Sequence, residues 1–146
     1  MVAPRYLVDT NVLSEPIRKE PDEAVVRKLR EFGSELATAS VVWHELVFGV
    51  RLLRASRKRT AIERYLAEVV AAAIPILPYD GAAAEWHGEQ RARLSKAGLT
   101  PPFVDGQIAA VAAVHDLILI TDNVRDFAHF HGSRVERWHE SVRLER

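Results

Sequence analysis

The chain has 146 residues, of which 48% are hydrophobic and 27% charged, and its formal net charge at pH 7 is zero. These values are ordinary for a soluble protein of one domain, so we expect a single domain over residues 1–146. The absence of cysteine excludes disulfides and thiolate metal sites, and it fits a reducing compartment.

No basic-then-apolar signal segment is expected, and every apolar stretch is interrupted by a charged residue or proline, so we expect no membrane span. A net charge of zero gives no overall indication of nucleic-acid binding, which must then depend on a local patch.

Short apolar runs alternate with helical patterns along the chain. In order, the predicted strands are Tyr6–Asp9, Leu36–Ala39, Ile74–Leu77, Leu117–Thr121 and Val135–Trp138. Residues 117–120 are apolar without alternation, which is typical of a strand covered on both faces.

The helical patterns lie between these strands. The first predicted helix starts at Pro21 and ends at Gly33, and the second is capped by Ser40 and runs to about Arg54. A third is marked by the apolar residues Ile62, Leu66, Val69 and Val70. A fourth runs from Ala82 to Ala97 and is closed by Gly98, and a fifth is opened by Pro101 and Pro102 and runs through Val114. Strands that alternate with helices over short connections favour parallel pairing. We therefore expect a three-layer α/β/α sandwich with a central parallel sheet of about five strands. In such open sheets, functional sites lie beyond the carboxyl ends of the strands.

Four acidic residues occupy positions where folding alone does not call for an acid. Asp9 and Asp122 follow predicted core strands directly. Glu45 and Asp105 interrupt the apolar faces of two predicted helices, and Asp105 lies in a first turn, where the helix dipole favours a carboxylate. Because each of these helices follows a strand, all four carboxylates can meet at the carboxyl edge of the sheet.

Several carboxylates in one partly dry cleft repel one another and lose hydration. A divalent cation relieves both costs, and carboxylate oxygens suit Mg²⁺, with Mn²⁺ as a substitute. Such a site can support metal-assisted hydrolysis of a phosphodiester.

Taken singly, the acids also have structural explanations. Asp9 can cap a helix in "TNVLSE", Asp105 can pair with a helix dipole, and Asp122 can form a turn with Asn123. Asp126 lies one helical turn beyond Asp122 and suits either the surroundings of a metal or a solvated cap.

The histidines and tryptophans are interpreted as structural. His44 and His87 are expected to face away from the apolar stripes or to lie at their borders, and His129 and His131 to have a surface or packing role rather than to be metal ligands. The tryptophans are expected to anchor the core or an interface; they are Trp43, Trp86 and Trp138.

The segment "RLLRASRKRTAIER" is strongly basic. Arg51, Arg54 and Lys58 are expected on one helical face, which suits either plain solvation or phosphate binding beside the acidic site.

The chain resembles the PIN-domain nucleases, specifically the VapC-type toxins of bacterial and archaeal toxin–antitoxin pairs. The resemblance is carried by "YLVDTNVLSE", "ASVVWHELVFG", "PPFVDGQIAAVA" and "LILITDNVRDF", whose order and spacing cover nearly the whole chain. It implies an acidic metal site at Asp9, Glu45, Asp105 and Asp122, with Asp126 as the competitor for the fourth place. It also implies that Asn11 and Asn123 hold the strand ends and a water molecule in order.

The resemblance further implies a cytoplasmic Mg²⁺-dependent endoribonuclease that inhibits translation when released. It implies a homodimer and a cognate antitoxin that blocks the acidic pocket, in a heterotetramer or larger assembly. Asp9 and Asp105 are expected to hold Mg²⁺ most directly, with Glu45 positioning or deprotonating the attacking water.

Other functions are weighed against this one. A catalytically silent PIN-like regulatory module and a PIN nuclease of RNA processing outside a toxin–antitoxin pair both remain open. A phosphoacceptor receiver domain needs a lysine near a late strand, but Lys96 is the last lysine. An aspartyl phosphatase needs a second aspartate two residues after Asp9, where Asn11 stands.

Overall fold

The strands form a single parallel sheet in the order β3-β2-β1-β4-β5. In the computed structural model, which describes residues 3–141, the strands are β1 (Tyr6–Val8), β2 (Leu36–Ala39), β3 (Ile76–Leu77), β4 (Ile118–Ile120) and β5 (Val135–Glu136). All five predicted strands are confirmed, and all except β2 are shorter than predicted.

Seven α-helices are found among the described residues: α1 (Thr10–Leu13), α2 (Glu23–Glu31), α3 (Ser40–Arg51), α4 (Arg57–Tyr65), α5 (Gly81–Lys96), α6 (Phe103–Val114) and α7 (Val124–Phe127). Short 3₁₀ turns span Glu15–Ile17 and Gly33–Glu35, and α4 continues into a π-helical stretch, Leu66–Ala71. No helix in residues 3–141 is long and apolar enough to span a membrane.

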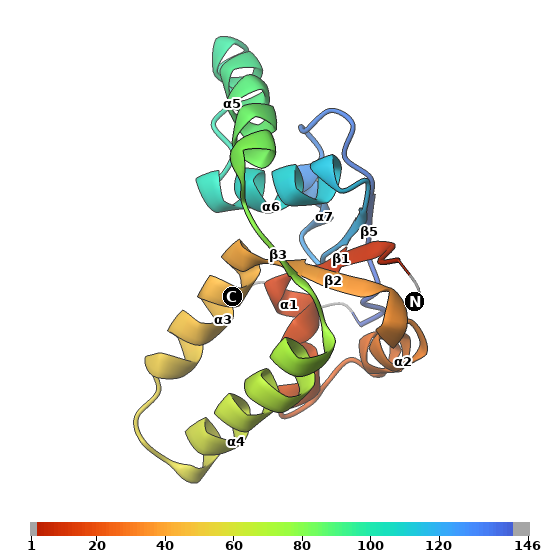
Figure 1. The fold of residues 1–146 in the computed structure, drawn as a ribbon, viewed down its shortest axis with the longest axis vertical. Coiled ribbons are helices and arrows are strands. Elements are labelled where there is room, and N and C mark those ends of the chain that lie inside the picture. Colours follow the sequence, from red (N-terminus) through yellow and green to blue (C-terminus); the bar gives the residue numbers. More distant parts are fainter. Residues whose placement is uncertain (1–2, 142–146) are drawn as a thin grey trace.

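The helices cover both faces of the sheet, which confirms the predicted three layers. In Figure 1 the strands lie between α5, α6 and α7 on one side and α1, α2 and α4 on the other. The same view shows α3 and α4 reaching away from the sheet as a hairpin.

The burial of β1 and β4 explains why their sequences are unbroken apolar runs. Leu7, Val8, Leu119 and Ile120 are fully buried because β1 and β4 are central strands with helices on both faces. The sheet edge is reinforced by the buried Thr38 hydroxyl, which donates to the Val8 carbonyl oxygen at 2.8 Å. Because β1, β2 and β4 are parallel neighbours, the residues that follow them meet at one edge.

Two helix ends test the predictions in detail. Gly98 follows α5 with a φ of +79°, which confirms the left-handed position predicted for it. The prediction that Ser40 caps a helix is wrong: Ser40 is the first residue of α3, and its hydroxyl accepts a hydrogen bond from the Tyr79 backbone amide at 3.2 Å.

Residues 137–141, here called the strap, cross the molecule beside α2. Trp138 is buried, and its ring lies 5.3 Å from the Tyr6 ring and 5.6 Å from the Phe32 ring, measured between centroids. Trp138 is therefore the core anchor that was predicted. Trp43 and Trp86 are half-buried and pack against the core.

Candidate functional site

Asp9 lies at the point where β1 ends and α1 begins. Its side chain is 6% exposed and caps α1: Oδ1 accepts a hydrogen bond from the Thr10 amide at 2.7 Å. Oδ2 accepts from the Thr121 hydroxyl at 2.8 Å and from the Asn11 side-chain amide at 3.4 Å. Burial raises the pKa of Asp9, hydrogen bonds from Thr121 and Thr10 act in the opposite direction, and the charge of Asp126 raises it further. Asp9 is therefore both a helix cap and a firmly oriented acid.

Glu45 reaches the same place from the middle of α3. Its Oε1 accepts a hydrogen bond from the Thr10 hydroxyl at 3.2 Å. Because the Thr10 backbone amide donates to Asp9, Thr10 links the two acids. Burial raises the pKa of Glu45; the Thr10 hydrogen bond lowers it, and the Asp9 charge raises it again. The half-buried position of Glu45 agrees with its predicted place on the apolar face of α3.

Asp105 approaches from the first turn of α6. Burial, followed by the charges of Asp126, Asp9 and Glu45, raises the pKa of Asp105 to about 6. These effects outweigh the helix dipole, which favours the carboxylate at this position. The structure therefore brings Asp9, Glu45, Asp105 and Asp126 within electrostatic reach of one another.

Asp105→Asn is expected to stabilise the metal-free protein at pH 7. The folded pKa of about 6 lies above the ordinary value of 3.8, so ionising Asp105 costs more free energy in the folded chain than in the unfolded chain. This cost is fully present above pH 6 and fades as the pH falls from 6 towards 4. Thermal unfolding in EDTA should give a higher Tm for the variant at pH 7, with a difference that shrinks at pH 4.

The matched control for this prediction is Glu89→Gln, which changes an exposed acid on α5 and should leave the Tm unchanged at both pH values. If Asp105→Asn is less stable than the natural chain across the whole pH range, ionisation of Asp105 does not carry the free-energy cost that the raised pKa implies.

Asp122 lies at the predicted sheet edge, but its side chain turns away from the other acids. Its Oδ1 accepts a hydrogen bond from Arg137 Nε at 2.8 Å and lies 3.7 Å from Nδ1 of His139. The charge that acts on Asp9 and Asp105 is that of Asp126, which is exposed on α7. Arg137 and His139 of the strap thus lie beside the Asp122 carboxylate, which is not among the charges that act on Asp9, Glu45 or Asp105, so Asp126 competes with Asp122 for the fourth place in the acid cluster.

Asn11 and Thr121 form the floor of the site. The Asn11 side-chain oxygen accepts from the Asp122 amide at 3.0 Å, while its nitrogen donates to Asp9 and, at 3.4 Å, to the Thr121 hydroxyl. The Asn123 amide donates to the same hydroxyl at 3.1 Å. Asn11 thus holds two strand ends together, while Asn123 takes part through its backbone. Thr121 is fully buried and was not predicted as a site residue.

A buried contact between an acid and a histidine was also missed by the sequence predictions. Glu15 and His139 are both fully buried at the side chain, and His139 Nε2 lies 3.1 Å from Glu15 Oε2. Asp22 accepts hydrogen bonds from the amides of Glu140 and Ser141 at 3.0 and 2.9 Å. These contacts fasten the strap to the segment that carries Asp9.

The basic run does not form one helical face, contrary to prediction. Helix α3 ends at Arg51 and α4 begins at Arg57, so Arg51, Arg54 and Lys58 lie on two helices and the loop between them. Arg51 pairs with Glu63, at 3.6 Å between Nε and Oε2. Arg54 and Lys58 are exposed, and no ion pair in residues 3–141 involves either of them. The tip of the hairpin is therefore a basic patch.

The burial of the histidines can be compared with the positions predicted for them. His44, His129 and His131 are exposed, but His87 is buried, so of the two positions predicted for it the one facing away from the core is wrong.

The donor set of the acid cluster consists of carboxylate oxygens, which suit a hard divalent cation. In the described part of the chain, no lysine or arginine pairs with Asp9, Glu45 or Asp105, and their pKa values are raised first by burial and then by the charges of neighbouring acids. Among residues 3–141, no three acidic or histidine side chains are already gathered closely enough to hold one ion. The chemistry of the donors fits Mg²⁺, and closing them around it requires side-chain movement.

Comparisons with known proteins agree on one family. The family model described as "PIN domain" matches residues 6–132. The tRNA(fMet)-specific endonuclease VapC of Shigella flexneri is 32% identical over 136 residues, which cover 92% of this chain and 98% of that protein. Toxin FitB of Neisseria gonorrhoeae is 31% identical over 137 residues, which cover 92% of this chain and 99% of that protein. The FitAcB crystal structure from Neisseria gonorrhoeae superposes with a TM-score of 0.82 at 31% identity, covering 89% of this chain and 95% of the other.

Proposed function

This chain belongs to the PIN domain family and is similar to its VapC proteins, and we propose that it is a Mg²⁺-dependent endoribonuclease and the toxin of a toxin–antitoxin pair. The observation that carries the proposal is the electrostatic proximity of Asp9, Glu45 and Asp105 at the carboxyl edge of the sheet, where burial and neighbouring acids raise their pKa values. The names of the relatives, which include ribonucleases and an endonuclease, support the choice of RNA as substrate.

Asp9 and Asp105 would hold the metal, with Asp126 rather than Asp122 completing the set. Thr121 and Asn11 fix the Asp9 carboxylate through its Oδ2, which leaves less conformational freedom to lose on binding. A bound Mg²⁺, or Mn²⁺ in its place, supplies Lewis-acid stabilisation of the charge that develops on the phosphoryl oxygen.

Glu45 is the group placed to take a proton from the attacking water. Its raised pKa makes it a stronger base than an ordinary carboxylate, and the Thr10 hydroxyl holds it in place. Direct attack by water leaves a 5′-phosphate and a 3′-hydroxyl.

The partners follow from the same relatives. Solved structures similar to this chain include FitAB bound to a DNA fragment, with a TM-score of 0.84 at 28% identity, and DNA-bound VapBC from Salmonella typhimurium, with 0.80 at 27%. VapBC-5 from Mycobacterium tuberculosis, a member of the VapBC family of toxin–antitoxin systems, superposes with a TM-score of 0.64 at 28% identity, which supports a cognate antitoxin for this chain. We assign it a homodimer that joins its antitoxin in a larger assembly, and a cytoplasmic site of action on translation.

The test of this function is incubation of the purified protein with total RNA, with Mg²⁺ and separately with EDTA, followed by mapping of the new ends. Cleavage should require Mg²⁺ and leave 5′-phosphates. Products with 2′,3′-cyclic phosphates that persist in EDTA would contradict the mechanism. Cleavage without growth arrest on expression would indicate RNA processing outside a toxin–antitoxin pair, and no cleavage at all a silent module.

The basic patch at the hairpin tip is expected to bind RNA phosphates. The double variant Arg54→Ala/Lys58→Ala should weaken RNA binding in EDTA and reduce the slope of log affinity against log salt concentration by about 1 to 2. Fluorescence anisotropy over a salt series measures both quantities. Arg27→Ala, which removes an exposed arginine of α2 that lies 3.8 Å from Glu140, is the control and should leave the slope unchanged. An unchanged slope in the double variant would leave the patch with solvation as its only role.

A further inference from the structure

Helix α5 meets the first turn of α6 through the ring of His87. This side chain is 3% exposed, and its Nδ1 lies 3.0 Å from the Tyr79 hydroxyl, within hydrogen-bond distance. The ring centroid of Phe103, the first residue of α6, is 4.9 Å from that of His87. The imidazole is therefore held on one side by a hydrogen bond and on another by an aromatic ring.

Gly106 is the residue that allows this contact. A Cβ atom at position 106 would lie 2.1 Å from Nε2 and 2.6 Å from Cδ2 of His87, far inside van der Waals distance. The ring cannot swing aside freely, because Tyr79 and Phe103 hold it. The close approach of the two helices at this place thus depends on a residue without a side chain.

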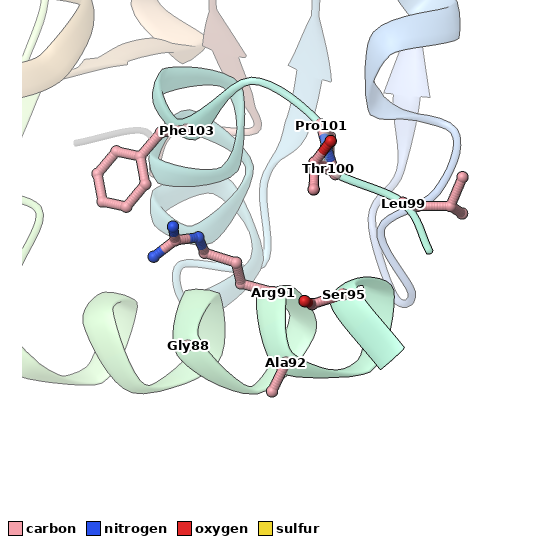
Figure 2. Close-up of a pocket in the computed structure, with 8 residues that line it drawn as sticks. All are labelled: Gly88, Arg91, Ala92, Ser95, Leu99, Thr100, Pro101 and Phe103. Carbon is pink, nitrogen blue, oxygen red and sulfur yellow. The ribbon is translucent and has the colours of Figure 1, made fainter. Parts of the chain in front are cut away.

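Beyond His87 the two segments separate. A pocket of about 400 Å³ lies between α5 and the loop that leads into α6. Figure 2 shows Arg91 in this pocket, directed toward Phe103. Its lining includes Gly88 and Ser95 of α5 and Leu99 and Thr100 of the loop. The seat of His87 against Gly106 is therefore one direct constraint that α5 places on the start of α6, beside Arg91, whose guanidinium lies 4.9 Å from the Phe103 ring centroid.

We propose that His87 is a positioning residue for the acid cluster: its ring, seated against Gly106, sets where the first turn of α6 lies and thereby places Asp105. Asp105 directly precedes Gly106, so any displacement of the helix backbone at Gly106 moves the Asp105 carboxylate relative to Asp9 and Glu45. The consequence for catalysis rests on the function proposed above, whereas the placement of Asp105 does not.

The test uses a compensating pair of substitutions. Gly106→Ala should weaken Mg²⁺ binding, measured calorimetrically on RNA-free protein, by about 10-fold and lower kcat/KM by roughly 100-fold. In metal-free protein it should also speed amide hydrogen exchange at residues 105–107. Adding His87→Ala should recover most of each loss, because the smaller side chain makes room for the new methyl group.

Gly88→Ala is the matched control, since a Cβ at that α5 position would meet no atom within 4 Å. It should leave all three measurements unchanged. The inference is overturned if Gly106→Ala behaves like Gly88→Ala, or if the folded double variant is as defective as Gly106→Ala alone. If the natural chain neither binds Mg²⁺ nor cleaves RNA, the proposed function fails, and hydrogen exchange still decides the role of His87.

Discussion

Asp9→Asn should lower the rate of RNA cleavage by roughly 1,000-fold or more while leaving the protein folded. The substitution removes the buried charge that the other acids face, and with it a carboxylate ligand for the cation. The shape of the side chain is kept, and the Thr121 hydroxyl can rotate to donate or accept, so the floor of the site should survive. The measurements are kcat/KM on a defined RNA and the Tm in EDTA.

Asp80→Asn makes the same chemical change at a helix cap that lies outside the acid cluster, and it serves as the control. Asp80 caps α5 by accepting a hydrogen bond from the Ala83 amide at 3.0 Å, and asparagine is an equally good capping residue. Activity within about twofold of the natural chain is expected for this control. A folded Asp9→Asn variant with comparable activity would remove the basis for metal-dependent catalysis at this site.

Asp126→Asn and Asp122→Asn should have opposite effects. The first removes an acid whose charge acts on both Asp9 and Asp105, so we expect cleavage to fall roughly 100-fold with little change in stability. The second removes the negative charge from the 2.8 Å contact with Arg137, so we expect the free energy of unfolding to fall by about 1 kcal/mol while the variant keeps most of its activity.

Steady-state kinetics at saturating Mg²⁺ and urea unfolding of both variants distinguish the two roles. The reverse result, an inactive but stable Asp122→Asn and a fully active Asp126→Asn, would return Asp122 to the fourth position that the resemblance suggested.

Strands β1, β3 and β4 were predictable because each is an apolar run bounded by polar residues or proline. Two features of the helices were not. The loop between α3 and α4 falls in "LLRAS", which contains neither glycine nor proline, so the pattern predicted a helix that continued to about Arg54. The π-helical stretch Leu66–Ala71 has apolar spacing that suits an α-helix equally well.

The acids of the site were predictable where they break an apolar pattern, as Glu45 does between Val42 and Leu46. The direction of the Asp122 side chain was not, because it depends on Arg137, fifteen residues later in the chain. Glu15 carried the same kind of signal as Glu45, an acid between Leu13 and Ile17, and its buried contact with His139 shows that the signal was informative. His87 was misplaced because α5 is rich in alanine and has no distinct apolar face to indicate which side is buried.

The position of β1 between β2 and β4 has a consequence for protein synthesis. The hydroxyl that orients Asp9 belongs to Thr121, which is added to the growing polypeptide 112 residues later. Domains fold from the amino-terminal side as translation proceeds, so β1, β2 and β3 can associate while the remaining strands are still inside the ribosome. A nascent polypeptide at that stage has no completed acid site, so the proposed nuclease activity would arise only after translation of each copy is almost finished.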